Sequence, residues 1–297
     1  MGFVLAIVAA LLGAFIGPLA RLAMDSGLRP LEVAFWRAAL AGVAFAVHAA
    51  VLRCPRPPAR DLAKLSAFGA FGMGSLYAGY LLCIREGGAA LASILLYTAP
   101  VWVLLGSILF LKEKATRRTL LAMGLSMLGV LGVSVGPGFS GRGPALAFGL
   151  LSGVAYAAYF LLGKRLLSRY PAPLIFAVAL PSAAVVLAIL SPPHLPSLRG
   201  LYVLLPLALL GTFAVYGLQY AALSRLAPGP AAIAALVEPV GASLLSAALF
   251  GEKLGVLGWC GLGLVLVGVA LTAFASPSAP PPAPVDAPVL PPGGEAP

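Results

Sequence analysis

Charged side chains are scarce in this sequence. Only 19 Lys or Arg and nine Asp or Glu occur among its 297 residues, which is 9% of the chain, and the mean hydropathy is +1.03. A water-soluble globular domain carries about 25% charged residues. Because this chain has too few polar groups to cover its own surface, lipid must be its solvent. The composition therefore excludes a soluble globular protein and predicts a lipid bilayer as partner.

Residues that build metal centres, disulfides and hydrolytic sites are also few. The chain has three cysteines and two histidines: Cys54, Cys83, Cys260, His48 and His194. They form no CxxC pair and have no metal-ligand spacing, so neither a disulfide framework nor a metal site is indicated. The motifs GxSxG and HExxH are absent as well. We therefore expect no metal, no cofactor and no enzymatic activity.

Nucleotide and nucleic-acid binding have no support either. Gly163-Lys164-Arg165 resembles the end of a phosphate-binding loop, but the upstream glycine is missing and Arg replaces Ser or Thr, so no ATP site is indicated. Primary active transport by this chain alone is therefore not expected. The net charge of +10 forms no basic stripe with interleaved aromatic residues. The cations lie in short loops between apolar runs, as membrane topology requires, and nucleic acid is not a predicted partner.

Ten apolar runs, each near the ~20 residues of a membrane-spanning helix, fill most of the chain. We place them at 3–23, 31–52, 65–85, 90–111, 118–136, 145–163, 173–190, 201–223, 230–250 and 255–275. No basic residue precedes the first run, and a polytopic pattern follows it, so we expect a retained helix rather than a cleaved signal. The tail, 276–297, holds nine prolines in 22 residues, which predicts a disordered cytoplasmic segment.

The Lys and Arg residues predict the orientation in the membrane. With a cytoplasmic N-terminus, the even-numbered loops carry twelve: Arg53, Arg56, Arg60, Lys64, Lys112, Lys114, Arg117, Arg118, Lys164, Arg165, Arg169 and Arg225. The odd-numbered loops and helix ends carry six: Arg21, Arg29, Arg85, Arg142, Arg199 and Lys253. Cytoplasmic loops are the ones enriched in Lys and Arg. We therefore predict a multi-pass protein of the cell inner (plasma) membrane with both termini cytoplasmic.

The second half of the chain repeats the first. Adding 139 to positions 72–133 overlays them on 211–272 without a gap, and 12 of the 39 positions from 92 to 130 are identical. The matches include Tyr77 with Tyr216, Pro100 with Pro239, Glu113-Lys114 with Glu252-Lys253, Gly124 with Gly263, and Gly129 with Gly268. Common apolar residues alone would not produce this set. We divide the chain into a first repeat, 1–138, a second repeat, 139–275, and the tail.

Five helices in each repeat predict that the two repeats are inverted. An odd number makes the second copy enter the membrane from the opposite side. The copy keeps Glu-Lys after its fourth helix but loses three cations, because Lys112, Arg117 and Arg118 correspond to Gly251, Val256 and Leu257. That loss is expected of a loop moved to the outer face. The predicted fold is an all-α membrane protein with ten transmembrane helices in two inverted five-helix repeats.

Two stretches, SILLYTAPVWVLLGSILFLKEK (93–114) and IAALVEPVGASLLSAALFGEK (233–253), carry a family resemblance. With ten helices, inverted halves, a mid-helix proline and a KE or GE loop before a Gly-rich helix, residues 3–275 resemble the drug/metabolite transporter (DMT) superfamily, and most closely its EamA-type exporters. The resemblance implies secondary transport, often outward, of amino acids, other small metabolites, nucleotide sugars or amphipathic drugs. It does not identify the substrate.

Glu238 is the strongest candidate for a functional residue. It lies about nine residues into the ninth predicted helix, hence roughly 13 Å deep, where an ionised carboxylate is costly. The adjacent Pro239 leaves a carbonyl one turn earlier without its N–H donor. The first repeat has Ala99 before Pro100, so the acid is not part of the repeated pattern. We expect Glu238 to couple protons or bind a substrate amine; a protonated carboxyl that ties two helices together is the alternative.

Arg37 is the only basic residue well inside a predicted helix, roughly 9 Å from its external end. We expect it to receive a substrate carboxylate or to approach Glu238 across a central cavity. Alternatively, it turns outward to the membrane interface beside Trp36. The corresponding part of the second repeat, LIFAVALPS, has no cation. The sequence leaves both alternatives open.

Tyr, Thr, Trp and Gln side chains recur at helical spacing within the predicted spans. They are Tyr77 and Tyr80 in the third, Tyr97, Thr98 and Trp102 in the fourth, Tyr156 and Tyr159 in the sixth, and Tyr216, Gln219 and Tyr220 in the eighth. Residues three or four apart share one face of a helix. Hydroxyl, amide and aromatic groups suit an amphipathic ligand or a cation; packing in the core is the alternative.

Alternating access is the mechanism that this pattern favours. Carriers built from inverted repeats bind substrate near the midplane between the repeats. We therefore predict a secondary transporter that exports a small metabolite, an amino acid or a related amphipathic compound, with coupling to protons left open. The alternatives are a membrane-embedded enzyme and a passive subunit of a larger complex. Both a monomer and a homodimer are compatible with the sequence.

Overall fold

Every regular element of the structure is a helix, within the residues that the computed structural model describes, 1–111, 116–134, 143–250 and 255–275. The two Glu-Lys pairs and the Pro-rich tail lie outside these residues. The first repeat contains α1 (Gly2–Gly13), α2 (Ile16–Asp25), α3 (Pro30–Val51), α4 (Ala59–Ala67), η1 (Phe68–Met73), α5 (Gly74–Leu96), α6 (Ala99–Leu111) and α7 (Arg117–Ser134). The second contains α8 (Gly143–Leu167), α9 (Ala172–Leu190), α10 (Leu198–Ala208), η2 (Leu209–Ala214), α11 (Val215–Leu223), α12 (Pro228–Ala234), α13 (Val237–Phe250) and α14 (Val256–Ala275).

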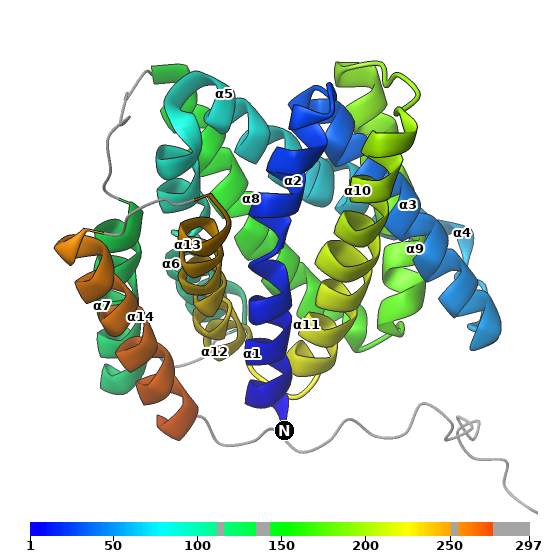
Figure 1. Cartoon of the computed structure of the whole chain (residues 1–297). Coiled ribbons are helices and arrows are strands. Elements are labelled where there is room, and N and C mark those ends of the chain that lie inside the picture. Colours follow the sequence, from blue (N-terminus) through cyan, green and yellow to red (C-terminus); the bar gives the residue numbers. More distant parts are fainter. Residues whose placement is uncertain (112–115, 135–142, 251–254, 276–297) are drawn as a thin grey trace, which may run out of the picture.

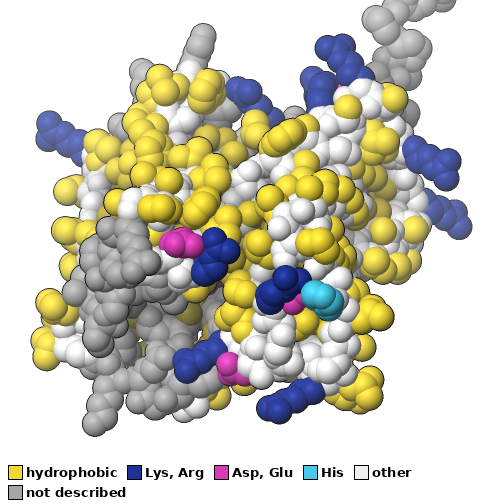
Figure 2. Space-filling view, turned by 90° about the horizontal axis from the view of Figure 1, so that it is seen from above, with side chains coloured by type: hydrophobic (Ala, Val, Ile, Leu, Met, Phe, Trp, Pro, Cys, Tyr) yellow, Lys and Arg dark blue, Asp and Glu magenta, His cyan; other side chains and the backbone are white. Residues whose placement is uncertain are grey.

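Helix α3 illustrates why the bundle belongs in a membrane. Its inner face buries small side chains such as Ala38 and Ala41, while Val43, Val47 and Val51, four residues apart, are 58–74% exposed. A helix on the surface of a soluble protein turns polar residues outward. The view from above in Figure 2 shows apolar side chains over much of that face, with Lys or Arg at scattered points. The exposed valines of α3 suit contact with lipid tails.

The predicted fold class is confirmed. Among the described residues, nine helical segments are long and apolar enough to cross a membrane. Helix α7, which opens with Arg117-Arg118 in its first turn, holds the place of the remaining predicted span and is less apolar than the nine. The chain is therefore an all-α membrane protein built from two inverted five-helix repeats.

Contacts between the repeats dominate the packing. The most extensive helix pairings among the described residues are α5 with α8, α7 with α14, α3 with α9, and α1 with α11. Each of them joins one repeat to the other, and α7 and α14 stand side by side at the left of Figure 1. Since the same pairs recur after exchange of the repeats, the bundle has a pseudo-twofold axis through its centre.

An aromatic cluster fills the core on one side of this axis. Phe176 of α9 packs against Phe45 of α3 and Tyr220 of α11, with ring centroids 4.9 Å and 4.4 Å apart. Tyr159 of α8 lies 4.9 Å from the Tyr220 ring and closes the cluster. Such tilted ring pairs add attraction beyond the area they bury. They hold α3, α8, α9 and α11 in fixed positions around the centre.

The helices differ from the predicted spans in two ways. The connection expected between the third and fourth spans is itself helical, because α5 continues from Gly74 to Leu96 and arches over the upper end of the molecule in Figure 1. The first span, expected to be one helix at 3–23, is divided at Ala14-Phe15 into α1 and α2. Gly13 precedes this break, and glycine weakens a helix interior by lacking a side chain to restrict the backbone.

Candidate functional site

Three helices are interrupted near the middle of the bundle. One interruption separates α1 from α2, another separates α5 from α6 at Tyr97-Thr98, and the third separates α12 from α13 at Ala235-Leu236. Pro100 and Pro239 lie in the first turns of α6 and α13, where the lack of a proline N–H costs no helical hydrogen bond. In membrane proteins, broken helices of this kind occur where the backbone is enclosed by protein or lines a polar site.

Tyr77 and Tyr216 mark the pseudo-twofold axis. Their hydroxyl oxygens lie 2.7 Å apart and share one hydrogen bond, in which either can donate. The two residues are 139 positions apart, the offset that relates the repeats, so each tyrosine bonds to its own counterpart. Both side chains are buried. The bond joins α5 to α11 at the centre of the bundle. It places two aromatic rings side by side at the site.

Arg37 points inward to this tyrosine pair. Its guanidinium carbon lies 4.9 Å from the centre of the Tyr77 ring and 5.9 Å from that of Tyr216, distances at which a cation is attracted to an aromatic face. Its Nε donates to the Thr212 hydroxyl at 2.5 Å, and Nη2 donates to the Gly211 carbonyl at 3.3 Å. The outward alternative for Arg37 is not what the structure shows.

A short π-helix supplies the partners of Arg37. Gly211 and Thr212 belong to η2, and the other repeat has a similar π-helical segment, η1, in its third span. A π-helix pairs each N–H with the carbonyl five residues back, which shifts neighbouring carbonyls out of line, and such segments often occur at functional sites. The third and eighth spans therefore both widen next to the axis.

Glu238 occupies the first turn of α13, directly after the break. Its side chain faces Gly13: a methyl group added to Gly13 would lie 2.9 Å from the Glu238 Cδ. The Tyr97 hydroxyl is within hydrogen-bonding reach of the carboxylate, and Arg37 lies within its electrostatic range. Both Arg37 and Glu238 are only partly buried although they lie deep in their spans. The site thus holds one cation and one acid, from opposite repeats.

The other predicted residues fall into three groups. Around the two charges lie Tyr80, Tyr97, Tyr156 and Gln219, each linked to Glu238, to Arg37 or to one another by electrostatic contacts or hydrogen bonding. Thr98 and Trp102 stabilise the break locally, because the Thr98 hydroxyl donates to the Leu95 carbonyl and accepts from the Trp102 indole. Tyr159 and Tyr220 belong to the aromatic core, where the Tyr220 hydroxyl donates to the Tyr159 carbonyl at 3.0 Å.

Thr212 and Gly13 were not among the site residues predicted from the sequence. Thr212 precedes Tyr216 by four residues, a spacing that places both on one helix face and that could have revealed it. Gly13 leaves room for the Glu238 carboxylate, because a methyl group at Gly13 would lie 2.9 Å from the Glu238 Cδ. This contact joins different spans, and no local pattern encodes it.

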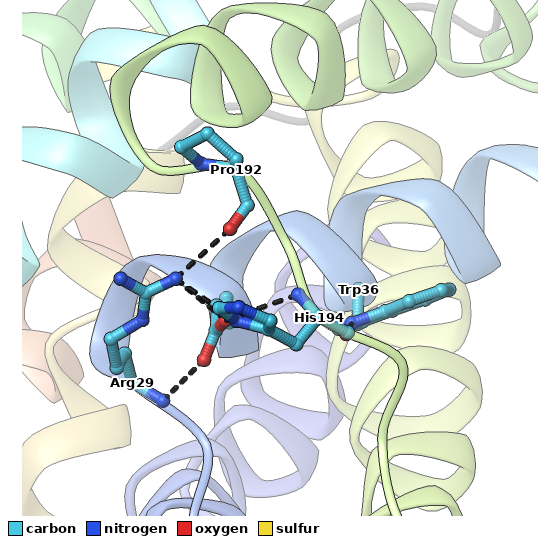
Figure 3. Close-up of polar contacts among 5 residues, drawn as sticks. Arg29, Trp36, Pro192 and His194 are labelled. Carbon is cyan, nitrogen blue, oxygen red and sulfur yellow. Dashed lines mark hydrogen bonds and ion pairs between the residues drawn. The ribbon is translucent and has the colours of Figure 1, made fainter.

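A second polar cluster fastens the repeats together at the upper end of the bundle (Figure 3). Its centre is Glu32, a buried acid that accepts from the Arg29 backbone N–H at 2.8 Å and pairs with the Arg29 guanidinium at 2.9 Å. His194 Nδ1 lies 2.6 Å from the same carboxylate. The Trp36 indole donates to the His194 carbonyl, and Arg29 to that of Pro192.

The effect of this cluster is to tie the loop before α10 to the start of α3. The Glu32 carboxylate also raises the pKa of the Arg29 guanidinium above its ordinary value, because it accepts a hydrogen bond from the charged form. Nothing in the local pattern distinguishes Glu32, since an acid in the first turn of a helix is common. Its partner His194 comes from a loop about 160 residues later in the chain.

Comparison with known proteins identifies the family. The model of the EamA-like transporter family matches this chain twice, at residues 1–135 and 143–274. The chain therefore belongs to the EamA-like transporter family, within the DMT superfamily. A solved crystal structure that covers 93% of this chain and 97% of its own has a TM-score of 0.78 at 16% identity, which shows the shared fold.

Several relatives carry the word transporter in their names. An "Uncharacterized transporter" of Archaeoglobus fulgidus is 31% identical over 82% of this chain and 88% of its own length. The "Uncharacterized inner membrane transporter YedA" of Escherichia coli K12 is 27% identical over 82% of both chains. A "Probable terminal-alkyne amino-acid exporter" of Streptantibioticus cattleyicolor is 30% identical over 52% of this chain and 51% of its own. This chain is a multi-pass membrane transporter and not an enzyme.

Proposed function

We propose that this transporter exports an amino acid or a closely related amphipathic metabolite by alternating access between its two repeats. The observation that carries the proposal is that Arg37 and Glu238, one charge from each repeat, both lie deep in the bundle, with Arg37 within electrostatic range of the Glu238 carboxylate. A zwitterion presents a carboxylate and an ammonium group a few ångströms apart. Arg37 would receive the carboxylate and Glu238 the ammonium group, while the surrounding tyrosines would contact the side chain.

The surroundings of the two charges support this assignment. Arg37 has its guanidinium face against Tyr77 and two of its nitrogens on Thr212 and Gly211, so its position is fixed before a substrate arrives. A preorganised group loses little entropy on binding. Glu238 sits at the N-terminal end of α13, where the helix dipole favours its negative charge. An acid and a base held apart in this way discriminate against uncharged compounds.

We further propose that Glu238 also carries the coupling proton. An ionised carboxylate at membrane depth is costly when no positive charge is bound to it. Glu238 would therefore bind either a proton or the substrate ammonium group. Exchange of one for the other would link outward movement of substrate to inward movement of protons. The name of the exporter from Streptantibioticus cattleyicolor supports amino acids as the class of cargo and export as the direction.

The repeats would act as the two moving bodies. We propose their limits as 1–138 and 139–275, with both termini in the cytoplasm because twelve Lys or Arg then face the cytoplasm against six outside. Tyr77 and Tyr216 lie where the repeats meet, so rocking about this pair would expose Arg37 and Glu238 first to one side and then to the other.

Transport by the purified protein in proteoliposomes tests the proposal. The probe is a mixture of radiolabelled amino acids, offered with and without a pH gradient across the vesicle membrane. We expect uptake that rises with the gradient. Glu238→Gln should lower the uptake at least about tenfold, because loss of one charged partner of a bound ligand costs about 2 kcal/mol or more, and should abolish the response to the gradient.

Glu86→Gln is the matched control, because it makes the same chemical change in an acid that pairs with Arg85 away from the site. We expect it to transport like the wild type. If Glu238→Gln transported normally and kept its response to the gradient, coupling through Glu238 would be excluded. If the wild-type protein took up none of the amino acids, the proposed class of substrate would be wrong.

A further inference from the structure

A further polar contact between the repeats lies at the opposite end of the bundle from Glu32. The Tyr170 hydroxyl, in the turn between α8 and α9, donates to Asp61 Oδ2 at 2.6 Å, and Asp61 belongs to the first turn of α4. Lys64, one turn further along α4, donates to the other carboxylate oxygen of Asp61 at 2.6 Å. The Asp61 carboxylate also raises the pKa of the Tyr170 hydroxyl. Asp61 is thus satisfied from both repeats.

A hollow of about 310 Å³ opens beside this contact. Besides Asp61 and Tyr170, its lining includes three cations: Lys64 from the first repeat, and Arg165 and Arg169 from the second. Against the single acid, these leave two positive charges in excess. Lys64 and Tyr170 already satisfy Asp61, and the exposed side chains of Arg165 and Arg169 line the hollow beside it.

The position of the hollow relates it to the membrane surface. Arg165 lies in the last turn of α8 and Asp61 in the first turn of α4, so the hollow is at the ends of membrane-spanning segments. Arg165 donates to the Phe110 carbonyl at 3.1 Å, which places the end of α6 next to it. The side chains of Phe110 and Leu109 are 68% and 70% exposed, an apolar surface adjoining the cations.

We propose that this hollow binds the phosphate of an anionic phospholipid, with the guanidinium groups of Arg165 and Arg169 on the phosphate oxygens and the acyl chains against the exposed end of α6. Arginine pairs with phosphate through two parallel hydrogen bonds, and basic pockets between membrane helices are suited to lipid head groups. In the orientation proposed above, the hollow faces the cytoplasmic leaflet, which carries negative surface charge.

Binding at this place would have a mechanical consequence. Arg165 and Arg169 come from the second repeat, whereas α6, against which the acyl chains would lie, belongs to the first, so the bound lipid would bridge the repeats beside the Asp61–Tyr170 bond. A ligand shifts an equilibrium towards the state that it binds more tightly. The lipid would therefore favour the state in which the repeats are joined at this end. The proposal does not depend on which substrate the transporter moves.

Lipid-dependent melting of the purified full-length protein tests the site. Melting temperatures are compared in detergent micelles doped with phosphatidylglycerol, in micelles doped with phosphatidylcholine, and in micelles with inorganic phosphate at the same concentration. We expect phosphatidylglycerol to raise the melting temperature by several degrees over the other two, because a ligand of the folded state stabilises it. Arg165→Gln with Arg169→Gln should abolish this increment.

Arg117→Gln with Arg118→Gln is the matched control, since it removes two exposed arginines that do not line the hollow. We expect it to keep the full increment. Native mass spectrometry gives a second readout, in which wild type and control retain a phosphatidylglycerol molecule that the Arg165/Arg169 variant loses. If phosphatidylglycerol raised the melting temperature of both variants equally, the effect would be general electrostatics, and the proposed binding site would be wrong. If inorganic phosphate alone produced the full rise in melting temperature, the proposal that a lipid occupies the hollow would be wrong.

Discussion

The two repeats can be compared position by position, and they differ in a consistent way. Where a residue is shared, it serves the scaffold: Tyr77 bonds to Tyr216 on the axis, and Pro100 and Pro239 follow the breaks in matching helices. Where the repeats differ, the charges of the site appear. Arg37 corresponds to Phe176 in the aromatic core, and Glu238 corresponds to the buried Ala99.

Symmetry and chemistry are therefore carried by different residues in this molecule. Inverted repeats supply two equivalent bodies that can rock about an axis, and this requires the shared residues. A substrate with two unlike ends has no such symmetry, so the groups that would receive it must come from one copy each. Arg37 is contributed by the first repeat alone and Glu238 by the second alone.

The largest effect is expected when the acid is moved to the other repeat. In the variant Ala99→Glu with Glu238→Ala, the carboxylate takes the pseudo-symmetric place. Ala99 is 1% exposed and packs in the apolar core, so an acid there lacks the room that Gly13 gives Glu238. We expect amino-acid uptake in proteoliposomes to fall to background and the melting temperature to drop, because a buried unpaired acid costs several kcal/mol.

Ala99→Leu serves as the control for size without charge. It should destabilise the protein less than Ala99→Glu, since overpacking by an apolar side chain costs about 1–3 kcal/mol. Wild-type uptake by the exchanged variant would show that the repeats are interchangeable at this position, contrary to the comparison above.

A smaller, symmetrical effect is expected at the glycines between α7 and α14. A methyl group on Gly129 would meet Val265, and one on Gly268 would meet Ser126, the repeat counterpart of Val265. Gly129→Ala and Gly268→Ala should each lower the stability by about 1–3 kcal/mol through overpacking. Melting in detergent measures both. Gly124→Ala and Gly263→Ala, on the same helices with nothing within 4 Å, are the controls, and equal losses there would refute the packing explanation.

An effect of similar size is expected at the axis. Tyr77→Phe and Tyr216→Phe each break the same hydrogen bond and leave one buried hydroxyl unpaired, at a cost of about 1–3 kcal/mol. The double variant leaves no hydroxyl unpaired and should be no less stable than either single one. A double-mutant cycle of melting measurements tests this, with the exposed Tyr202→Phe as control. Additive losses would show that the two hydroxyls do not act as a pair.

Much of the fold could be predicted because the relevant signals are local or repeated. Apolar runs of about 20 residues indicate membrane spans directly. The constant offset of 139 between matching positions indicates the repeat without any knowledge of contacts. The breaks near Pro100 and Pro239 follow from the missing proline N–H. The break between α1 and α2 has no proline and was missed, as were the two π-helical segments, since neither has a strong signature in the residues themselves.

The candidate site was predicted only in outline. Depth along a helix identified Arg37 and Glu238, because burial of a charge in lipid is costly wherever the helix points. Helical spacing grouped Tyr159 and Tyr220 with the site although they pack in the aromatic core, since spacing shows which residues share a face but not what that face meets. Gly13 and Thr212 contact Glu238 and Arg37 from other spans, and the cluster around Glu32 depends on a distant loop.

The membrane environment, the spans, their duplication and the charged residues inside them all follow from composition and from distance along the chain. Three contacts do not follow in this way and depend on the folded bundle: Tyr77 bonds to its own counterpart, Arg37 turns inward to Thr212, and Gly13 makes room for Glu238. Each of these contacts joins different spans, and the rotation of one span against another is set by the packing of the whole bundle.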